Sequence, residues 1–313
     1  MKTKQSRILI FGAGVIGSTF GGLFSRAGYD VTLLARNSRL KELKENGLLL
    51  QKSNQSKVLR TTVNIISELQ EDDIFDFVFV TLRKDQVVQA LPVLSKNKSQ
   101  NFVFMVNNPS GYSEWIDAIG YDRVIPAFPG SGGKIENGIV LYQIVSGIIQ
   151  PTTFGELNGK KSNRIIQLKE ILSSSGFPVS VSENMDAWQK THVAMVGPLG
   201  DVIYYDGCNN YTVAKNKSAI EQMNLALKEN FMFLDKSGIG IEPVKLSFFK
   251  IAPLWMLNII MKFAFNTKWA ETVISNHAIN ARAEMKIISN EFLQMAKSKG
   301  FRLPEFEKLT ARI

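Results

Sequence analysis

The stretch Arg7-Ile8-Leu9-Ile10-Phe11-Gly12-Ala13-Gly14-Val15-Ile16-Gly17 decides the fold, because a short apolar run opens there into the spacing G-x-G-x-x-G. The apolar run predicts a buried strand, and apolar residues then recur at helical spacing up to residue 27. A second apolar run over residues 31–35 follows a turn at residues 28–30 and completes a predicted β-α-β unit. This setting favours a dinucleotide-binding turn, because glycines let the backbone approach a pyrophosphate and the helix N-terminus offers N–H donors. The expected cofactor-binding residues are Gly12, Ala13, Gly14, Val15, Ile16 and Gly17. The alternative is an ordinary β-α-β unit with a flexible turn.

The residue that follows the second predicted strand bears on the choice of cofactor. NAD-binding chains usually place Asp or Glu there, on the ribose 2′-hydroxyl. Here the position is Arg36, followed by Asn37, Arg39 and Lys41. A guanidinium can hold a 2′-phosphate in a forked geometry, and no carboxylate repels it. The pattern predicts NADP(H) rather than NAD(H), and a solvated basic loop is the other interpretation.

Length and composition fit a folded protein of two domains. The chain has 313 residues, of which 45% are hydrophobic, and a formal net charge of +9. Lys and Arg are scattered without a run of five, so we expect an anionic cofactor and substrate rather than nucleic acid to account for the charge. Cys208 is the single cysteine, which excludes an intramolecular disulfide and favours a reducing compartment. With His192 and His277 as the two histidines, we expect no metal site.

Two segments resemble targeting or membrane signals. The basic N-terminus precedes an apolar stretch, but the same residues spell the glycine turn and no small-x-small cleavage site follows, so we expect no export. The apolar segment 251–261 is shorter than a membrane span. We therefore expect a cytoplasmic protein that does not bind membranes.

Strand and helix signals alternate in the first part of the chain. Further strands are predicted at residues 77–81, 101–106, 123–129 and 178–181, helices at 86–94 and 164–173, and a less regular extension at 139–145 and 152–157. From residue 182 the signals become nearly all helical, with long periodic segments at residues 185–198, 219–236 and 269–299. The predicted fold class is α/β: a Rossmann-type, doubly wound parallel sheet over residues 1–181, then an all-α substrate or catalytic domain over residues 182–313.

The first predicted helix of the second domain carries Lys190 on a face of small residues, Ala187, Ala194 and Gly197. Such a face would let another molecule approach the ammonium closely, and a solvated lysine is the more ordinary interpretation. His192 lies on the opposite, apolar stripe, where a packed core histidine is expected. Glu284 shares a face with His277, Ala281 and Ile288, so its carboxylate points with apolar positions and is expected to have a partner or a task.

These motifs together resemble the ketopantoate reductases (2-dehydropantoate 2-reductases) over nearly the whole chain. The family's T-L-K motif corresponds to Thr81-Leu82-Arg83, and its N-G-x-G turn to Asn108-Pro109-Ser110-Gly111. Its W-x-K signature corresponds to Trp188-Gln189-Lys190, and its late Glu to Glu284. The resemblance implies NADPH-dependent reduction of a 2-oxo acid in a cleft between two domains, with ketopantoate as the first candidate. It also implies that Lys190 is the proton donor, that Glu284 holds substrate or orients Lys190, and that Arg83 and Asn108 contact cofactor or substrate.

The chain also departs from the family pattern. The family usually has Asn one and two turns after the lysine, where this chain has Ala194 and the pair Gly197-Pro198. The T-L-K lysine is Arg83, and the aromatic segment 244–268 fits the family pattern poorly. A related reductase with another substrate, or an NADP-binding sensor without catalysis, therefore stays open as an alternative. A homodimer also stays open.

Overall fold

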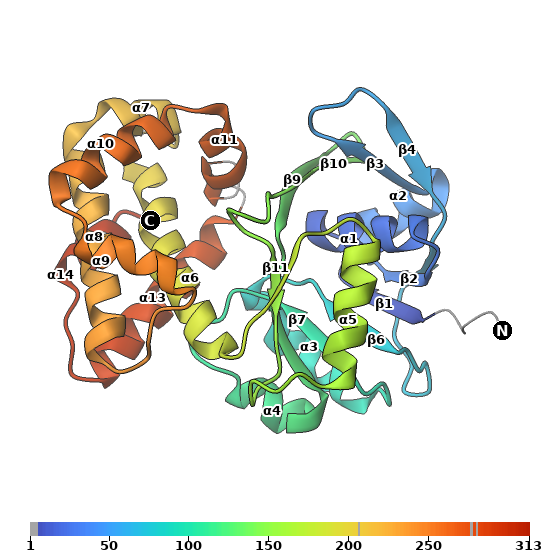
Figure 1. Cartoon of the computed structure of the whole chain (residues 1–313). Coiled ribbons are helices and arrows are strands. Elements are labelled where there is room, and N and C mark those ends of the chain that lie inside the picture. Colours follow the sequence, from blue (N-terminus) through green and yellow to red (C-terminus); the bar gives the residue numbers. More distant parts are fainter. Residues whose placement is uncertain (1–5, 206, 276–277, 280) are drawn as a thin grey trace. The chain divides into compact units, whose positions relative to one another are not determined.

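The computed structural model describes residues 6–205, 207–275, 278–279 and 281–313 (Figure 1). The chain divides into two units by its internal contacts. Unit 1 runs to Val106 and resumes over Tyr112–Met185, and unit 2 contains Asn107–Gly111 and Asp186–Ile313. The short loop Asn107–Gly111 thus interrupts unit 1 in the sequence and belongs to unit 2.

Unit 1 is built on an eight-stranded sheet of order β12-β11-β8-β7-β6-β1-β2-β5. Its strands are β1 (Arg7–Phe11), β2 (Asp30–Leu34), β5 (Asn64–Ile66), β6 (Phe77–Val80), β7 (Phe102–Met105), β8 (Val124–Phe128), β11 (Thr152–Phe154) and β12 (Val179–Val181). All neighbours run parallel except β11, which is antiparallel to β8. The predicted fold class is confirmed, with this one reversal in a sheet that the sequence predicted to be wholly parallel.

Helices cover both faces of this sheet, which explains why its central strands are apolar throughout. The helices of unit 1 are α1 (Val15–Arg26), α2 (Asn37–Asn46), α3 (Lys84–Lys96), α4 (Ser113–Ile119) and α5 (Asn163–Ser174), with a 3-10 turn, η1 (Tyr121–Arg123). On one face Phe79 of β6 packs against Phe24 of α1, with ring centroids 5.0 Å apart. On the other face Phe104 of β7 stacks on Trp115 of α4 at 4.3 Å.

A second sheet, of order β4-β3-β10-β9, packs beside α1. Its strands are β3 (Leu48–Lys52), β4 (Val58–Thr61), β9 (Ser131–Glu136) and β10 (Ile139–Ile144). A two-residue turn, Asn137-Gly138, joins β9 to β10, and both residues have positive φ (51° and 79°). Gly22 of α1 lets the sheet approach, since a Cβ there would lie 2.4 Å from a methyl of Leu50. The sequence predicted only an irregular extension where this sheet forms.

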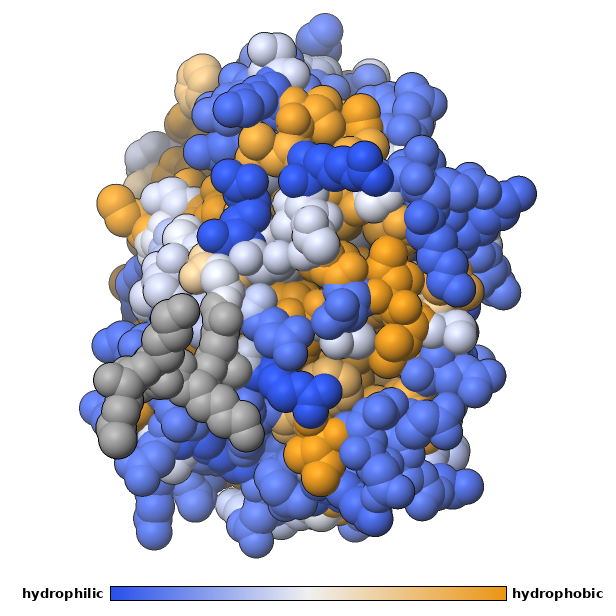
Figure 2. Space-filling model, turned by 90° about the vertical axis from the view of Figure 1, so that its right-hand side faces the viewer, coloured by the Kyte–Doolittle hydropathy of each residue, from blue (hydrophilic) through white to orange (hydrophobic). Residues whose placement is uncertain are grey.

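Surface composition on one side of the molecule is mixed. Figure 2 gives the view from the right-hand side of Figure 1, and hydrophilic residues cover most of that side, with apolar residues gathered between them. The apolar residues on this side are thus gathered into patches rather than spread evenly.

Unit 2 is helical where it is described. Its helices are α6 (Met185–Asp201), α7 (Asn210–Lys215), α8 (Lys217–Lys236), α9 (Phe248–Ile251), α10 (Leu254–Phe265), α11 (Lys268–Ala270), α13 (Arg282–Ser298) and α14 (Pro304–Thr310), with the turns η2 (Val202–Tyr205), η3 (Val244–Ser247) and the π-helical η4 (Glu271–Ser275). The periodic helical segment expected over residues 269–299 is interrupted: among the described residues, α11 and η4 come first and α13 begins at Arg282. The π turn of η4 shifts the phase of the chain before that point.

Among the described residues, no single helix is both long enough and apolar enough to cross a membrane. One pair, Val244–Ile251 with Leu254–Phe265, meets those two criteria when taken together and is bent by 117°.

Candidate active site

The glycine turn lies where the strand order of the main sheet reverses. β1 is paired with β2 on one side and with β6 on the other, and the turn follows the carboxyl end of β1. Ligands of open α/β sheets bind at such a switch point, outside the carboxyl ends of the strands. Thr81, just after β6, donates a hydrogen bond from Oγ1 to the Gly12 carbonyl at 2.9 Å. The Thr of the T-L-R motif thus fixes the glycine turn.

The three glycines of the turn lie in three different surroundings. Gly12 has φ +122°, and a Cβ there would lie 3.0 Å from the Thr81 carbonyl oxygen. A Cβ on Gly17 would lie 1.9 Å from the Gly12 carbonyl oxygen, so helix and strand pack too closely for a side chain. A Cβ on Gly14 would meet nothing within 4 Å. Gly14 therefore borders open space, which is the room that a pyrophosphate would occupy.

The first turn of α1 can serve an anion. Gly14 precedes Val15 and Ile16 at the helix start, the first turn holds no acidic residue, and among described residues no side chain caps it. Leading N–H groups and the positive end of a helix dipole are the features that bind phosphate groups at helix N-termini. The Ala13 carbonyl is held by Ser18 Oγ at 3.0 Å and Arg39 Nε at 3.2 Å. Arg39 thus supports the glycine turn, and it was not among the binding residues expected from the sequence.

Arg36 is exposed and directly precedes α2, two residues after the end of β2. It stands at the carboxyl edge of β2, next to the strand that carries the glycine turn. Arg83 is also exposed, but its Nε lies 3.3 Å from Oδ1 of Asp85. Arg83 therefore already has a carboxylate partner, while the Arg36 position suits a 2′-phosphate.

Lys190 lies on α6 and its side chain is 14% exposed. Its Nζ donates to Oδ2 of Asp186, one helical turn earlier. This i, i+4 pair holds the ammonium in place. The sequence analysis did not single out Asp186, although its spacing from Lys190 is visible in the sequence.

The small-residue face around Lys190 is not open, contrary to the sequence interpretation. Ala194 is fully buried in the core of unit 2, and a Cβ on Gly197 would lie 2.8 Å from the ring of Phe306. The small residues allow close packing within unit 2, so they give no reason for another molecule to approach. His192 is buried, and its ring stacks on Trp188 with centroids 5.2 Å apart, as expected for a core histidine.

Glu284 is buried in the first turn of α13, one turn before Ile288, with which it was expected to share a face. Asn107 Nδ2 lies 3.4 Å from Glu284 Oε1, and the Oδ1 atom of Asn107 is buried without a hydrogen-bond partner among the described residues. Two turns further along α13, Glu291 accepts a hydrogen bond from Ser110 Oγ at 2.6 Å. The loop Asn107–Gly111 is therefore fixed to α13 at two points. Asn108 is buried and donates to the Gly111 carbonyl at 2.6 Å, which sets the shape of the loop.

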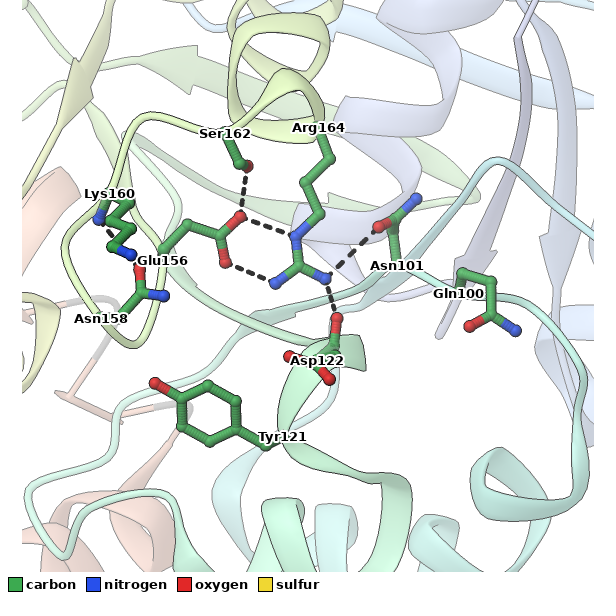
Figure 3. A pocket seen from close by; sticks show the side chains of 9 residues that line it. All are labelled: Gln100, Asn101, Tyr121, Asp122, Glu156, Asn158, Lys160, Ser162 and Arg164. Atoms are coloured by element: carbon green, nitrogen blue, oxygen red, sulfur yellow. Dashed lines mark hydrogen bonds and ion pairs between the residues drawn. The ribbon is translucent and has the colours of Figure 1, made fainter.

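A hollow of about 400 Å³ in unit 1 lies away from these residues (Figure 3). Four of its lining residues precede β7 and β8 and the others follow β11, which is antiparallel to β8, so it lies at the amino ends of β7 and β8, opposite the edge of the glycine turn. Arg164 Nε donates to Glu156 at 2.7 Å, and Ser162 Oγ donates to the same carboxylate. Burial raises the pKa of Glu156, but the hydrogen bonds from Arg164 and Ser162 outweigh it and hold that pKa below its ordinary value. This internal ion pair gives the hollow a structural role.

Metal ligands do not gather in the part of the chain that the structure describes: no three His, Cys, Asp or Glu side chains there are placed to hold an ion. His277 lies outside the described residues.

Comparison with known proteins adds three likenesses. The curated 2-dehydropantoate 2-reductase of Pyrococcus horikoshii is 26% identical over 245 residues, which cover 76% of this chain and 71% of that protein. The structure of 2-dehydropantoate 2-reductase from Geobacter metallireducens has a TM-score of 0.77 at 17% identity, covering 98% of both chains. The structure of D-mandelate dehydrogenase with NADH and anilino(oxo)acetate has a TM-score of 0.75 at 17% identity, covering 98% of this chain and 96% of that one. The two structures share the fold with this chain.

The family model described as ketopantoate reductase PanE/ApbA matches residues 8–159, which hold the glycine turn, Arg36, the T-L-R motif and Asn108. Residues 8–159 therefore match the ketopantoate reductase family, and the similar proteins above agree with that match.

Proposed function

We propose that the protein reduces a 2-oxo acid to a 2-hydroxy acid with NADPH, and that ketopantoate is its first candidate substrate. The family is one of oxidoreductases that act on a C=O or CH–OH group, so the predicted enzyme class is confirmed. One observation carries the assignment of the site. Lys190 and Glu284 belong to the same unit, both are withdrawn from solvent, and each has a polar partner, Asp186 and Asn107.

When bound, NADPH supplies the hydride that reduces the ketone. The glycine turn, Gly12 to Gly17, holds the pyrophosphate with backbone N–H groups, and Arg36 holds the 2′-phosphate. We assign Arg83 and Asn108 to the surroundings of the same cofactor. This division gives residues 1–181 the cofactor and residues 182–313 the substrate, except that Asn107, on the loop that belongs to unit 2, contributes to the substrate side.

Lys190 performs the acid step. Negative charge develops on the carbonyl oxygen as the ketone carbon is reduced, and the Lys190 ammonium stabilises that charge and donates a proton to the oxygen. Lys190 then regains its proton from water. Asp186 positions the ammonium, and Glu284 accepts a hydrogen bond from the substrate, with Asn107 fixing the orientation of the carboxylate.

The decisive experiment is steady-state kinetics of Lys190→Ala on an accepted 2-oxo acid. We expect kcat to fall by roughly 10²–10⁴-fold, the usual effect of a positioned general acid. Lys190→Arg should also be impaired, because a guanidinium keeps its charge and releases no proton near neutral pH. The dissociation constant for NADPH serves as the control and should change little. A near-normal kcat in Lys190→Ala would show that Lys190 is not the proton donor.

A second candidate function, reduction of a different 2-oxo acid, is favoured by Ala194 and Gly197. Both positions are packed into the core of unit 2, so no side chain there can replace the amides that the family pattern offers to substrate. A panel of 2-oxo acids with and without a hydroxyl separates the two candidates by kcat/KM. Tight NADPH binding without turnover of any of these acids would favour the alternative of an NADP-binding sensor without catalysis.

We further propose that the protein acts in the cytoplasm as a homodimer, without nucleic acid or a membrane as partner. The scattered basic residues and the small-molecule chemistry of the family support this proposal.

A further inference from the structure

Arg39 lies in the first turn of α2, and its guanidinium reaches the glycine turn. Its side chain is only 16% exposed, whereas Arg36, three residues earlier, is an exposed residue. The guanidinium donates from Nε to the Ala13 carbonyl at 3.2 Å and from Nη2 to Ser18 Oγ at 3.3 Å. Ser18 Oγ in turn donates to the same Ala13 carbonyl at 3.0 Å. Two side-chain donors thus hold one carbonyl of the glycine turn.

The remaining nitrogen of the Arg39 guanidinium is also engaged. Nη1 donates to the carboxylate of Glu42, one turn further along α2, and to the Gly138 carbonyl at 3.4 Å. A Cβ on Gly138 would lie 2.6 Å from Glu42 Oε1, so the turn between β9 and β10 packs directly on this ion pair. These four hydrogen bonds occupy four of the five N–H donors of the guanidinium. Arg39 therefore has little left to offer a phosphate directly.

The hold on the Ala13 carbonyl decides where the next N–H group points. In a planar trans peptide, the carbonyl and the N–H of the following residue point in opposite directions. Because the Ala13 carbonyl points toward Arg39 and Ser18, the Gly14 N–H points away from them. Gly14 is exposed, and its N–H has no acceptor among the described residues. It is thus a free donor beside the open space that a pyrophosphate would occupy.

Thr81 acts on the preceding peptide in the same way. Its Oγ1 donates to the Gly12 carbonyl at 2.9 Å and so fixes the direction of the Ala13 N–H. Two consecutive peptides of the glycine turn are therefore held by side chains from outside the turn. A turn that is ordered before its ligand arrives loses less conformational entropy when the ligand binds.

We propose that Arg39 is a positioning residue for the dinucleotide: it holds the Ala13–Gly14 peptide so that the Gly14 N–H donates to the pyrophosphate. This role rests on the proposed function of the glycine turn as the pyrophosphate site. The basic residues after β2 then have two separate tasks. Arg36 selects between the cofactors, and Arg39 fixes the turn that both cofactors share. The planar fork of an arginine spans these acceptors, whereas the donors of a lysine all share one atom.

Binding titrations of the full chain with NADPH and NADH test the inference without any substrate. Arg39→Met keeps the length of the side chain and removes its donors. The dissociation constants for both cofactors should rise, each by about tenfold, because both carry the pyrophosphate and a hydrogen bond from a charged donor is worth roughly tenfold or more. ADP-ribose, which has the pyrophosphate but neither the 2′-phosphate nor the nicotinamide, should weaken by the same factor.

Lys41→Met is the matched control. It removes a cation from the same helix at a side chain that is 79% exposed, and it should leave all three affinities within about twofold of the unaltered chain. Ser18→Ala is a second, milder variant that keeps the inference testable if Arg39→Met does not fold. It removes the other donor to the Ala13 carbonyl, so it should weaken NADPH and NADH equally and by a smaller factor. Circular dichroism melts establish that each variant is folded.

Two results would overturn the inference. A loss of affinity for NADPH with NADH unchanged would make Arg39 a ligand of the 2′-phosphate. Unchanged affinities for both cofactors in folded Arg39→Met would show that its hydrogen bonds serve local structure alone. Gly14→Val keeps the two proposals apart. If Gly14→Val abolishes binding and Arg39→Met does not, the positioning role fails alone, whereas binding that survives Gly14→Val removes the pyrophosphate site itself.

Discussion

Single residues set the choice of cofactor, and Arg36 is the one that separates NADPH from NADH. It is exposed at the end of β2, where a carboxylate would select NADH. We expect NADPH to bind at least tenfold tighter than NADH, which corresponds to about 1.4 kcal/mol. Arg36→Asp should erase this preference, as measured by fluorescence titration with both cofactors. Lys57→Asp, at an exposed lysine of unit 1 outside the proposed cofactor site, is the contrasting variant and should keep the preference for NADPH. Equal affinities in the unaltered protein would contradict the assignment.

The side chain of Asn107 is expected to help bind the substrate. Its amide lies 3.4 Å from Glu284 Oε1, and its own Oδ1 is buried without a partner among the described residues, a costly arrangement that a substrate hydroxyl could relieve. Asn107→Ala should raise KM by about tenfold with a smaller effect on kcat, because it disturbs binding rather than proton transfer. Ser110→Ala removes the other contact of the same loop with α13 and should leave KM nearly unchanged. Equal effects of the two changes would reduce Asn107 to a loop-fixing residue.

At the scale of structural elements, two glycines of the glycine turn allow a matched test of its role. Gly14→Val places a side chain in open space, so unit 1 should fold normally and lose dinucleotide binding. Gly17→Ala places a Cβ 1.9 Å from the Gly12 carbonyl oxygen, so it should destabilise the β1–α1 packing itself. Thermal melts and NADPH titration of both variants separate the roles. Normal NADPH affinity in Gly14→Val would refute the glycine turn as the pyrophosphate site.

The elements that the sequence predicted correctly are those with strong local periodicity. Strands β1, β6 and β7 are continuous apolar runs, and α1, α5 and α8 repeat at helical spacing, so pattern alone locates them. The second sheet was missed because β9, with the sequence Ser131-Gly132-Gly133-Lys134-Ile135-Glu136, has almost no apolar alternation. The Asn137-Gly138 dipeptide was the available signal, since it favours a two-residue hairpin turn.

Contacts between distant residues explain what the sequence could not predict at the site. Asn107 and Glu284 are 177 positions apart, and nothing in either local pattern indicates that they meet. The small face around Lys190 illustrates the opposite error. Helical spacing correctly placed Ala194 and Gly197 on one side of α6, but spacing cannot say whether Phe306 or solvent covers that side. The roles of Lys190, Glu284 and the cofactor residues stay predictions until the variants are measured.

At the scale of the whole molecule, a buried acid couples stability to pH. Asp201, at the end of α6, is fully buried and accepts hydrogen bonds from Ser289 of α13 at 3.2 Å and Thr310 of α14 at 3.0 Å. Burial raises its pKa from 3.8 to about 8, because the hydrogen bonds from Ser289 and Thr310 only partly offset the loss of hydration. One carboxyl thus joins three helices and is expected to be protonated at neutral pH.

The sign of the resulting pH dependence follows from proton uptake. Between about pH 4 and 8 the folded state keeps a proton that the unfolded chain releases, so the free energy of unfolding falls as the pH rises through this window. The slope for one proton approaches about 1.4 kcal/mol per pH unit. Asp201→Asn, which stays neutral, should remove this slope and make the protein more stable than the unaltered chain at pH 9. Urea unfolding monitored between pH 5 and 9 measures it, and Asp117→Asn, at an exposed carboxylate of unit 1, should keep the slope of the unaltered chain. If Asp201→Asn also keeps that slope, Asp201 is ionised in the folded protein and the three helices must hold a buried negative charge.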